Sequence, residues 1–172
     1  FNCHHIIVEN WDELESEKGV IFVSIPTLLD SSLAPEGKHI IHAFTPSSID
    51  EWEGLSREKY LNKKEEYFTF LVEKISKLLP NLEQKINHKE IGTPKTHRKF
   101  LGRYEGSYGP IPNRKLLGLL PMPFNTTKIK NLYCVGDSCF PGQGLNAVAF
   151  SGYACAHKIG SKLNINSFKL PD

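Results

Sequence analysis

The sequence predicts an α/β fold, and three observations along its 172 residues point to it. The first third holds short runs of β-branched and aromatic residues separated by turn residues, which favour antiparallel strands. Residues 56–79 place apolar side chains at three- and four-residue spacing, which is typical of one long helix. The last third joins a strand-length apolar run, 132–136, to a glycine-rich turn and a helix over about 145–163.

Three strands are expected in the first third. They cover residues 5–8, 20–23 and 39–44, and residues 34–37, Ala-Pro-Glu-Gly, are typical of a β-turn. No helix-length pattern lies between these runs, so antiparallel pairing is the simplest arrangement.

The middle of the chain is expected to be mainly helical. The long helix ends at Pro80, and a strand-like stretch follows over residues 82–91. Thr93-Pro94 supplies an N-cap and a first helical position for a short basic helix that ends near Phe100. Residues 102–123 are rich in Gly and Pro, which predicts an irregular loop able to cover a ligand.

Composition and charge limit the possible classes of protein. With 40% hydrophobic and 23% charged residues, the chain has the balance of a globular protein and not of a disordered one. No run approaches the ~18 apolar residues of a membrane-spanning helix. The formal net charge of +2 is too small to make nucleic acid the expected partner. Because the chain has no initiating Met, we interpret it as part of a longer protein.

The small net charge hides an uneven distribution. Residues 1–55 hold two Lys and ten Asp or Glu, whereas residues 56–115 hold fourteen Lys or Arg and seven Glu. The basic middle, including the short helix at residues 95–103, could contact an anionic surface such as lipid headgroups. An ordinary solvated face gives the same pattern, and we favour that interpretation.

The turn in the last third carries the candidate site. Asp137 follows the apolar run, and residues 140–144, Phe-Pro-Gly-Gln-Gly, allow a close backbone approach. The helix that begins near Leu145 offers unpaired N–H groups and a partial positive charge to an anionic ligand. The carboxylate can accept hydrogen bonds from sugar-type hydroxyls. A ligand-free turn or cap gives the same pattern, so spacing alone leaves both interpretations open.

The thiols and the nearby histidine do not follow a metal-ligand pattern. Cys134, Cys139, Cys155 and His157 lack the tight spacing of a zinc site, so we expect no metal. Four scattered cysteines are also too few for a disulfide scaffold in a chain of this length, and free thiols are expected.

One stretch of the last third closely matches a known motif. Residues 132–144, Leu-Tyr-Cys-Val-Gly-Asp-Ser-Cys-Phe-Pro-Gly-Gln-Gly, and residues 147–152, Ala-Val-Ala-Phe-Ser-Gly, resemble the carboxyl-terminal flavin motif of carotenoid isomerases. These enzymes belong with the phytoene desaturase-related FAD oxidoreductases. The resemblance extends to residues 24–26, 52–55, 92–97, 106–110 and 123–127, and so spans most of the chain.

The resemblance implies a division into two parts. Residues 1–125 would be the carboxyl-terminal part of a substrate domain whose sheet walls off an apolar tunnel. Residues 126–172 would be the terminal strand–helix segment of a Rossmann-like FAD-binding domain. The amino-terminal βαβ unit, which holds the ADP half of FAD in this family, is missing from this sequence, and we expect the rest of the protein to supply it.

FAD is the cofactor that the resemblance implies. Asp137 would bond its ribityl or pyrophosphate region, and the helix N-terminus would stabilise the reduced flavin. Position 146 is Asn where we expect an apolar residue, which bears on substrate preference more than on flavin binding. No catalytic residue is assigned. The cofactor-binding residues implied by the resemblance are Gly136, Asp137, Pro141, Gly142, Gly144, Leu145, Asn146 and Ala147.

Family members with this ending convert tetra-cis-lycopene to the all-trans form; they need reduced FAD and consume no net electrons. We therefore expect an FAD-dependent carotenoid cis–trans isomerase, of which this chain alone is inactive. Its expected substrate is a lipophilic carotenoid. We expect the protein to lie peripherally on a plastid or cyanobacterial-type photosynthetic membrane, or otherwise in the cytoplasm. Phe100, Tyr104 and Tyr108 could line the substrate tunnel or be ordinary core or rim aromatics. A desaturase-type FAD oxidoreductase and a non-catalytic, apolar-ligand-binding remnant remain as alternatives.

Overall fold

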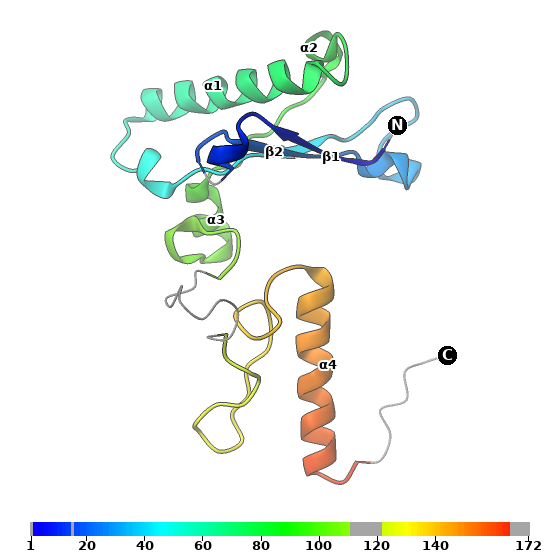
Figure 1. Cartoon of the computed structure of the whole chain (residues 1–172), viewed down its shortest axis with the longest axis vertical. Coiled ribbons are helices and arrows are strands. Elements are labelled where there is room, and N and C mark those ends of the chain that lie inside the picture. The colour runs from blue at the N-terminus through cyan, green and yellow to red at the C-terminus, as the bar shows by residue number, and fades with distance from the viewer. Residues whose placement is uncertain (1, 15, 111–121, 166–172) are drawn as a thin grey trace. The chain divides into compact units, whose positions relative to one another are not determined.

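The chain forms two compact units in its computed structural model (Figure 1). Unit 1 ends at Gly106 and unit 2 begins at Ser107. The predicted division at residues 125 and 126 concerns the domains of the whole protein and stays a prediction. The residues that the structure describes are 2–14, 16–110 and 122–165.

Unit 1 is built on a three-stranded antiparallel sheet. Its strands are β1 (His4–Val8), β2 (Val20–Ser24) and β3 (His42–Phe44), in the order β1-β2-β3. The predicted antiparallel pairing is confirmed. β3 begins later than expected because the N–H of Ile40 is bonded to Oγ1 of Thr27, at 3.3 Å, and not to a strand.

A long helix, α1 (Arg57–Ser76), covers one face of this sheet (Figure 1). Ser56 caps it, since its Oγ accepts a hydrogen bond from the N–H of Lys59 at 3.3 Å. The core between helix and sheet is centred on Ile21, Val23, Ile75 and Leu82. Full burial of such side chains contributes about 1.5–3 kcal/mol each, which makes this contact the main stabilising feature of the unit.

The stretch after α1 departs from the prediction. Asn81 takes a left-handed backbone (φ 62°), and Leu82 turns into the core at the start of a one-turn helix, α2 (Leu82–Lys85). The predicted strand over residues 82–91 is therefore wrong. Its apolar residues belong to a helical turn followed by an extended connection that joins no sheet.

The predicted short basic helix is confirmed as α3 (Pro94–Leu101). Oγ1 of Thr96 accepts the N–H of Thr93 at 3.0 Å, which closes the first turn. Gly102 ends the helix in the left-handed conformation, at φ 63°. The predicted loop continues from here, and its residues 111–121 lie outside the described residues. Single 3-10 turns complete unit 1: η1 (Trp11–Glu13), η2 (Pro26–Leu28), η3 (Ser31–Leu33), η4 (Ile49–Glu51) and η5 (Tyr104–Gly106).

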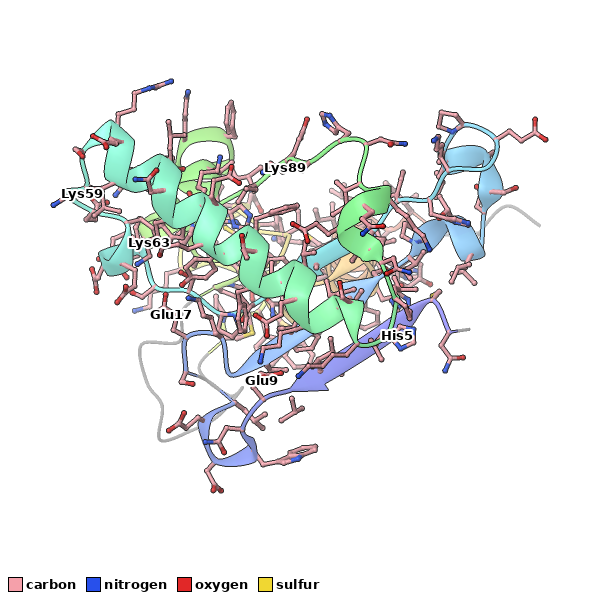
Figure 2. All side chains as sticks on the ribbon, turned by 90° about the horizontal axis from the view of Figure 1, so that it is seen from above. His5, Glu9, Glu17, Lys59, Lys63 and Lys89 are labelled. Atoms are coloured by element: carbon pink, nitrogen blue, oxygen red, sulfur yellow. The ribbon has the colours of Figure 1, made fainter. Side chains whose placement is uncertain are left out.

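Acidic side chains of the first third pair with basic ones of α1. Nζ of Lys63 lies 4.0 Å from Glu17, and both residues are labelled in Figure 2. The same Nζ lies 2.6 Å from Glu51, and Nζ of Lys74 lies 2.6 Å from Glu9. The hydrogen bond that Nζ of Lys74 donates to the Glu9 carboxylate raises the pKa of Lys74 above its ordinary value. These pairs bring acidic residues of the first third together with basic residues of the middle. Their contribution to stability is small, because they are partly exposed and salt screens them.

Unit 2 contains one long helix, α4 (Leu145–Lys162), which agrees with the helix predicted over 145–163. The strand predicted over 132–136 is wrong for the described chain. This segment forms an isolated bridge between Thr126 and Tyr133, because no further strand of the described unit extends the ladder. Within the described residues, no helix has both the length and the apolar content to cross a membrane.

Candidate functional site

Three glycines shape the turn between residue 136 and α4. Gly136, Gly142 and Gly144 have φ values of 112°, 118° and 101°, which side chains with a Cβ rarely adopt. A Cβ at Gly136 or Gly144 would meet no atom within 4 Å, so the backbone conformation and not crowding requires glycine there. Gly142 is buried, with Sδ of Met122 3.4 Å from the place of such a Cβ. The backbone of the turn is therefore exposed at Gly144 and covered at Gly142.

The start of α4 is open. Gly144 is its N-cap and provides no side-chain hydrogen bond, and the first helical bond runs from the N–H of Val148 to the carbonyl of Gly144, at 2.9 Å. The N–H groups of Leu145, Asn146 and Ala147 consequently have no acceptor within the helix. Leu145 is 82% exposed, so a ligand can reach this helix end and its partial positive charge.

Asp137 lies at the first bend of the turn. It is half-buried, and Oγ of Ser138 donates to its carboxylate at 3.4 Å. The bend closes through the N–H of Cys139, which donates to the carbonyl of Gly136 at 3.2 Å. Pro141, also half-buried, follows a cis peptide bond and leads into the glycines. All eight predicted cofactor residues lie within the continuous segment 136–147 of the sequence, and their role stays a prediction.

The thiol of Cys139 is buried beneath this turn. Its side chain is 2% exposed, and burial raises its pKa, with smaller contributions from Cys134, Cys155 and Asp137. A neutral thiol is a poor nucleophile and a poor metal ligand. Among the described residues, no three His, Cys, Asp or Glu side chains gather as a metal site. Cys139 therefore acts here as a small apolar side chain.

Sequence reasoning missed two polar residues that hold the turn together. Nδ2 of Asn125 lies 3.0 Å from the carbonyl oxygen of Cys134 and 3.1 Å from Oγ of Ser151. The same Oγ accepts the N–H of Gly136 at 3.3 Å, and Ser151 is fully buried. The only signal for Ser151 in the sequence is a serine among the small residues of the helix at 145–163.

The aromatic residues proposed for the substrate tunnel are exposed. Phe100, Tyr104 and Tyr108 are 72%, 76% and 70% exposed. Phe100 and Tyr104 belong to unit 1 and Tyr108 to unit 2. A hydrogen bond to Glu105 raises the pKa of Tyr104. Their role in lining a tunnel stays a prediction.

An apolar row crosses the sheet on the face opposite α1. Ile6, Phe22 and Phe44 occupy paired positions on β1, β2 and β3, and the rings of Phe22 and Phe44 stack at 4.9 Å. Their exposed fractions are 64%, 36% and 52%. Since neighbouring residues Ile21 and Val23 face the core, these three face the other way. Sequence reasoning identified the strands but not this second apolar face.

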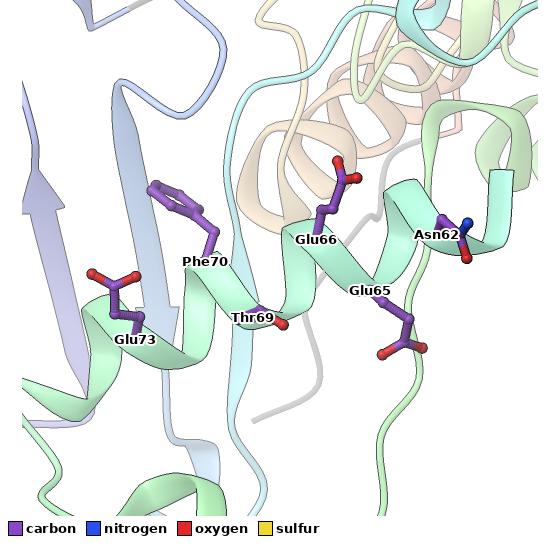
Figure 3. Close-up of a pocket in the computed structure, with 6 residues that line it drawn as sticks. All are labelled: Asn62, Glu65, Glu66, Thr69, Phe70 and Glu73. Atoms are coloured by element: carbon purple, nitrogen blue, oxygen red, sulfur yellow. The ribbon is translucent and has the colours of Figure 1, made fainter. Parts of the chain in front are cut away.

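A groove of unit 1 has a different character from this apolar row. It is an open groove of about 610 Å³ along α1 (Figure 3). Its glutamates make it acidic, and one of them, Glu65, pairs with Lys89. An apolar ligand bound there would take the glutamate carboxylates out of water, which costs free energy, so the groove is not a site for one. The lining residues are Asn62, Glu65, Glu66, Thr69, Phe70 and Glu73.

Among curated proteins, the matches with more than half of their residues identical are plant prolycopene isomerases. The chain is 55% identical, over 95% of its length, to a chloroplastic prolycopene isomerase of Arabidopsis thaliana. It is 58% identical, again over 95%, to the chloroplastic prolycopene isomerase 1 of an Oncidium hybrid cultivar. By sequence, the chain belongs to the prolycopene isomerase family. It spans 28% of the length of these two relatives.

Other curated proteins match this chain at lower identity. One is a 4,4'-diapolycopen-4-al dehydrogenase of Metabacillus indicus, 31% identical over 74% of the chain and 25% of that protein. No family model matches the sequence. The resemblance inferred from residues 132–152 is thus confirmed at the level of the prolycopene isomerase family.

Proposed function

We propose that this chain is the carboxyl-terminal part of an FAD-dependent carotenoid isomerase that converts tetra-cis-lycopene to all-trans-lycopene without net oxidation or reduction. The observation that carries the proposal is the 55–58% identity to prolycopene isomerases over 95% of the chain. The 31% identity to a carotenoid aldehyde dehydrogenase makes a net oxidoreductase the second candidate.

The glycine turn fits a flavin. Gly144 is exposed and has no side chain, so its backbone can approach a flat ring or its linker closely. Asp137 would accept a hydrogen bond from the ribityl chain or lie beside the pyrophosphate region. The open N-terminus of α4 would face the ring edge that becomes negative on reduction, and would favour the reduced form by about 0.3–2 kcal/mol.

FAD, when bound and reduced, supplies a transient electron or charge transfer that lowers the bond order of a polyene. The residues of this chain bind and orient the partners of that step. The apolar row Ile6–Phe22–Phe44 would form part of the wall along which the polyene lies, with water excluded from it. Phe100, Tyr104 and Tyr108 are further candidates for this wall.

We also propose a plastid location, because the matched relatives are named as chloroplastic. A carotenoid dissolves in lipid and not in water, so the protein would collect it at a membrane surface. Basic side chains of α3, such as Lys95 and Lys99, would favour peripheral contact with anionic headgroups.

The test is an anaerobic incubation of the full-length protein with tetra-cis-lycopene, with and without a reductant. We expect all-trans product of unchanged mass, formed only when the flavin is reduced. A product lighter by a pair of hydrogens, formed with oxidised FAD and an electron acceptor, would instead establish a desaturase. A purified protein without visible flavin absorbance and without product would be a non-catalytic remnant.

A further inference from the structure

Ser151 and Asn125 form a directional hydrogen-bond network inside unit 2. Oγ of Ser151 accepts from the N–H of Gly136 at 3.3 Å and from Nδ2 of Asn125 at 3.1 Å. The same Nδ2 also lies 3.2 Å from the carbonyl oxygen of Ser151 and 3.0 Å from that of Cys134. The backbone carbonyl of Asn125 in turn accepts the N–H of Cys134 at 2.9 Å.

The network joins three segments that are distant in the sequence. Asn125 precedes the apolar run, Cys134 and Gly136 end it, and Ser151 lies in the second turn of α4. A hydrogen bond depends on angle as well as distance, so the contacts fix the rotation and height of α4 relative to Gly136. The other buried side chains of α4 include Cys155, which is 4% exposed and packs without comparable directionality.

We infer that Asn125 and Ser151 are positioning residues, which set the register between the glycine turn and the N-terminus of α4. They place Asp137 and the N–H groups of Leu145–Ala147 relative to one another, and both residues lie outside the segment 136–147 that carries the proposed flavin site. The inference rests on the proposed flavin site. It goes beyond that site because it adds a residue outside the glycine turn. Ser151, in the second turn of α4, would contribute to the affinity for FAD and to the midpoint potential of the bound flavin.

The test compares Ser151→Ala with Cys155→Ala in the full-length protein. Both changes remove one small buried group from the same face of α4, since the residues are four positions apart. Only Ser151→Ala removes the acceptor of Gly136 and Asn125. The readouts are the thermal midpoint without cofactor, the Kd of FAD from flavin fluorescence, and the midpoint potential of the bound flavin.

We expect Ser151→Ala to weaken FAD binding roughly tenfold or more and to make the potential more negative, because the helix end no longer faces the reduced ring in register. Cys155→Ala should leave both values close to those of the unchanged protein even where it lowers the thermal midpoint as much. Ser151→Cys keeps the shape of the side chain and a weak acceptor. Its Kd and potential should therefore lie between those of the unchanged protein and of Ser151→Ala, and it replaces Ser151→Ala in the test if that variant does not fold.

Two results would overturn the inference, and they are distinguishable. If the unchanged protein binds FAD, and the serine variants lower the midpoint but leave Kd and potential as in Cys155→Ala, the network is only structural and the proposed function stands. If the unchanged protein binds no FAD, the proposed function fails and the inference fails with it.

Discussion

The two units differ in which of their side chains are buried. Unit 1 closes a core between its sheet and α1, with Ile21 fully buried and Trp52 2% exposed. In the described part of unit 2, the buried side chains are small, such as Ser151 and Cys155, while large apolar ones stay exposed. Those exposed side chains include Leu132, Val135, Leu145 and Phe150.

This difference shows where each unit finds its stability. The three antiparallel strands of unit 1 pair within one segment of the chain, so its core against α1 forms from its own residues, while Ile6, Phe22 and Phe44 stay exposed on the other face of the sheet. An apolar run such as 132–136 is suited to a buried strand whose neighbours come from elsewhere in the chain. In our account, the rest of the FAD-binding domain and the flavin cover unit 2. Substitutions should therefore alter folding in unit 1 and cofactor binding in unit 2.

The largest expected effect is that of Trp52→Ala in unit 1. Trp52 packs against Tyr60 and Tyr67, at ring distances of 5.6 and 5.3 Å, and its Nε1 donates to Ser47 at 2.8 Å. Removing the ring leaves a cavity and should cost about 3–5 kcal/mol in the free energy of unfolding. Chemical denaturation of the full-length protein, followed by circular dichroism, measures it.

The control for this change is Trp11→Ala, because Trp11 is 77% exposed. It should stay within about 0.5 kcal/mol of the unchanged protein. Equal effects of the two substitutions would contradict the burial of Trp52 against Tyr60 and Tyr67.

A matched pair of glycines tests the close packing at the end of unit 1. Gly102 and Gly106 have nearly the same backbone, with φ of 63° and 64°. A Cβ at Gly102 meets nothing within 4 Å, whereas one at Gly106 would overlap the carbonyl of Pro94. Alanine should cost about 1–2 kcal/mol at Gly102 from the left-handed conformation alone. It should cost a further 1–3 kcal/mol or so at Gly106 from overpacking. Equal losses of stability in the two variants would contradict the close approach.

In unit 2, Asp137→Ala should weaken FAD binding without unfolding the protein. A charge-assisted hydrogen bond to a cofactor hydroxyl contributes about 1.5–3 kcal/mol, so the Kd should rise ten- to a hundredfold. Flavin fluorescence titration gives the Kd, and a thermal melt without cofactor gives the stability. An unchanged Kd with a lower melting temperature would make Asp137 an ordinary turn residue.

The smallest effect is expected from Glu9→Gln, which removes the partner of Lys74 on α1. Because Glu9 raises the pKa of Lys74, the pair stabilises the fold fully below the ordinary lysine pKa of 10.5. The contribution is lost as the pH rises through the raised value. The variant should thus melt slightly lower than the unchanged protein at neutral pH, and the difference should shrink in high salt. A difference that grows at alkaline pH would contradict this.

The helices could be predicted from the sequence because their signals are local. The apolar spacing of α1, the Thr93-Pro94 start of α3 and the small-residue run of α4 each lie within the element they specify. The same reasoning failed over 82–91, where the left-handed Asn81 redirected an apolar stretch into the core. It failed again over 132–136, where a strand forms only with neighbours that the described chain does not provide.

The candidate site was only partly predictable for a related reason. Its glycines and Asp137 form one continuous motif, so a resemblance could find them. The bond between Asn125 and Ser151 joins residues 26 positions apart and leaves no periodic pattern. The apolar row on the open face of the sheet depends on strand register, which became known only with the pairing of Phe22 to Ile6 and Phe44.

The central claim is that unit 2 carries the flavin site, whereas the core of unit 1 between its sheet and α1 forms from that unit's own residues. Hydrogen–deuterium exchange of the full-length protein, with and without FAD, tests it most directly. We predict that FAD slows exchange over residues 136–147, where the N–H groups at the start of α4 gain a partner, and leaves β2 and the middle of α1 unchanged. Exchange over 136–147 that does not respond to bound FAD would contradict the account.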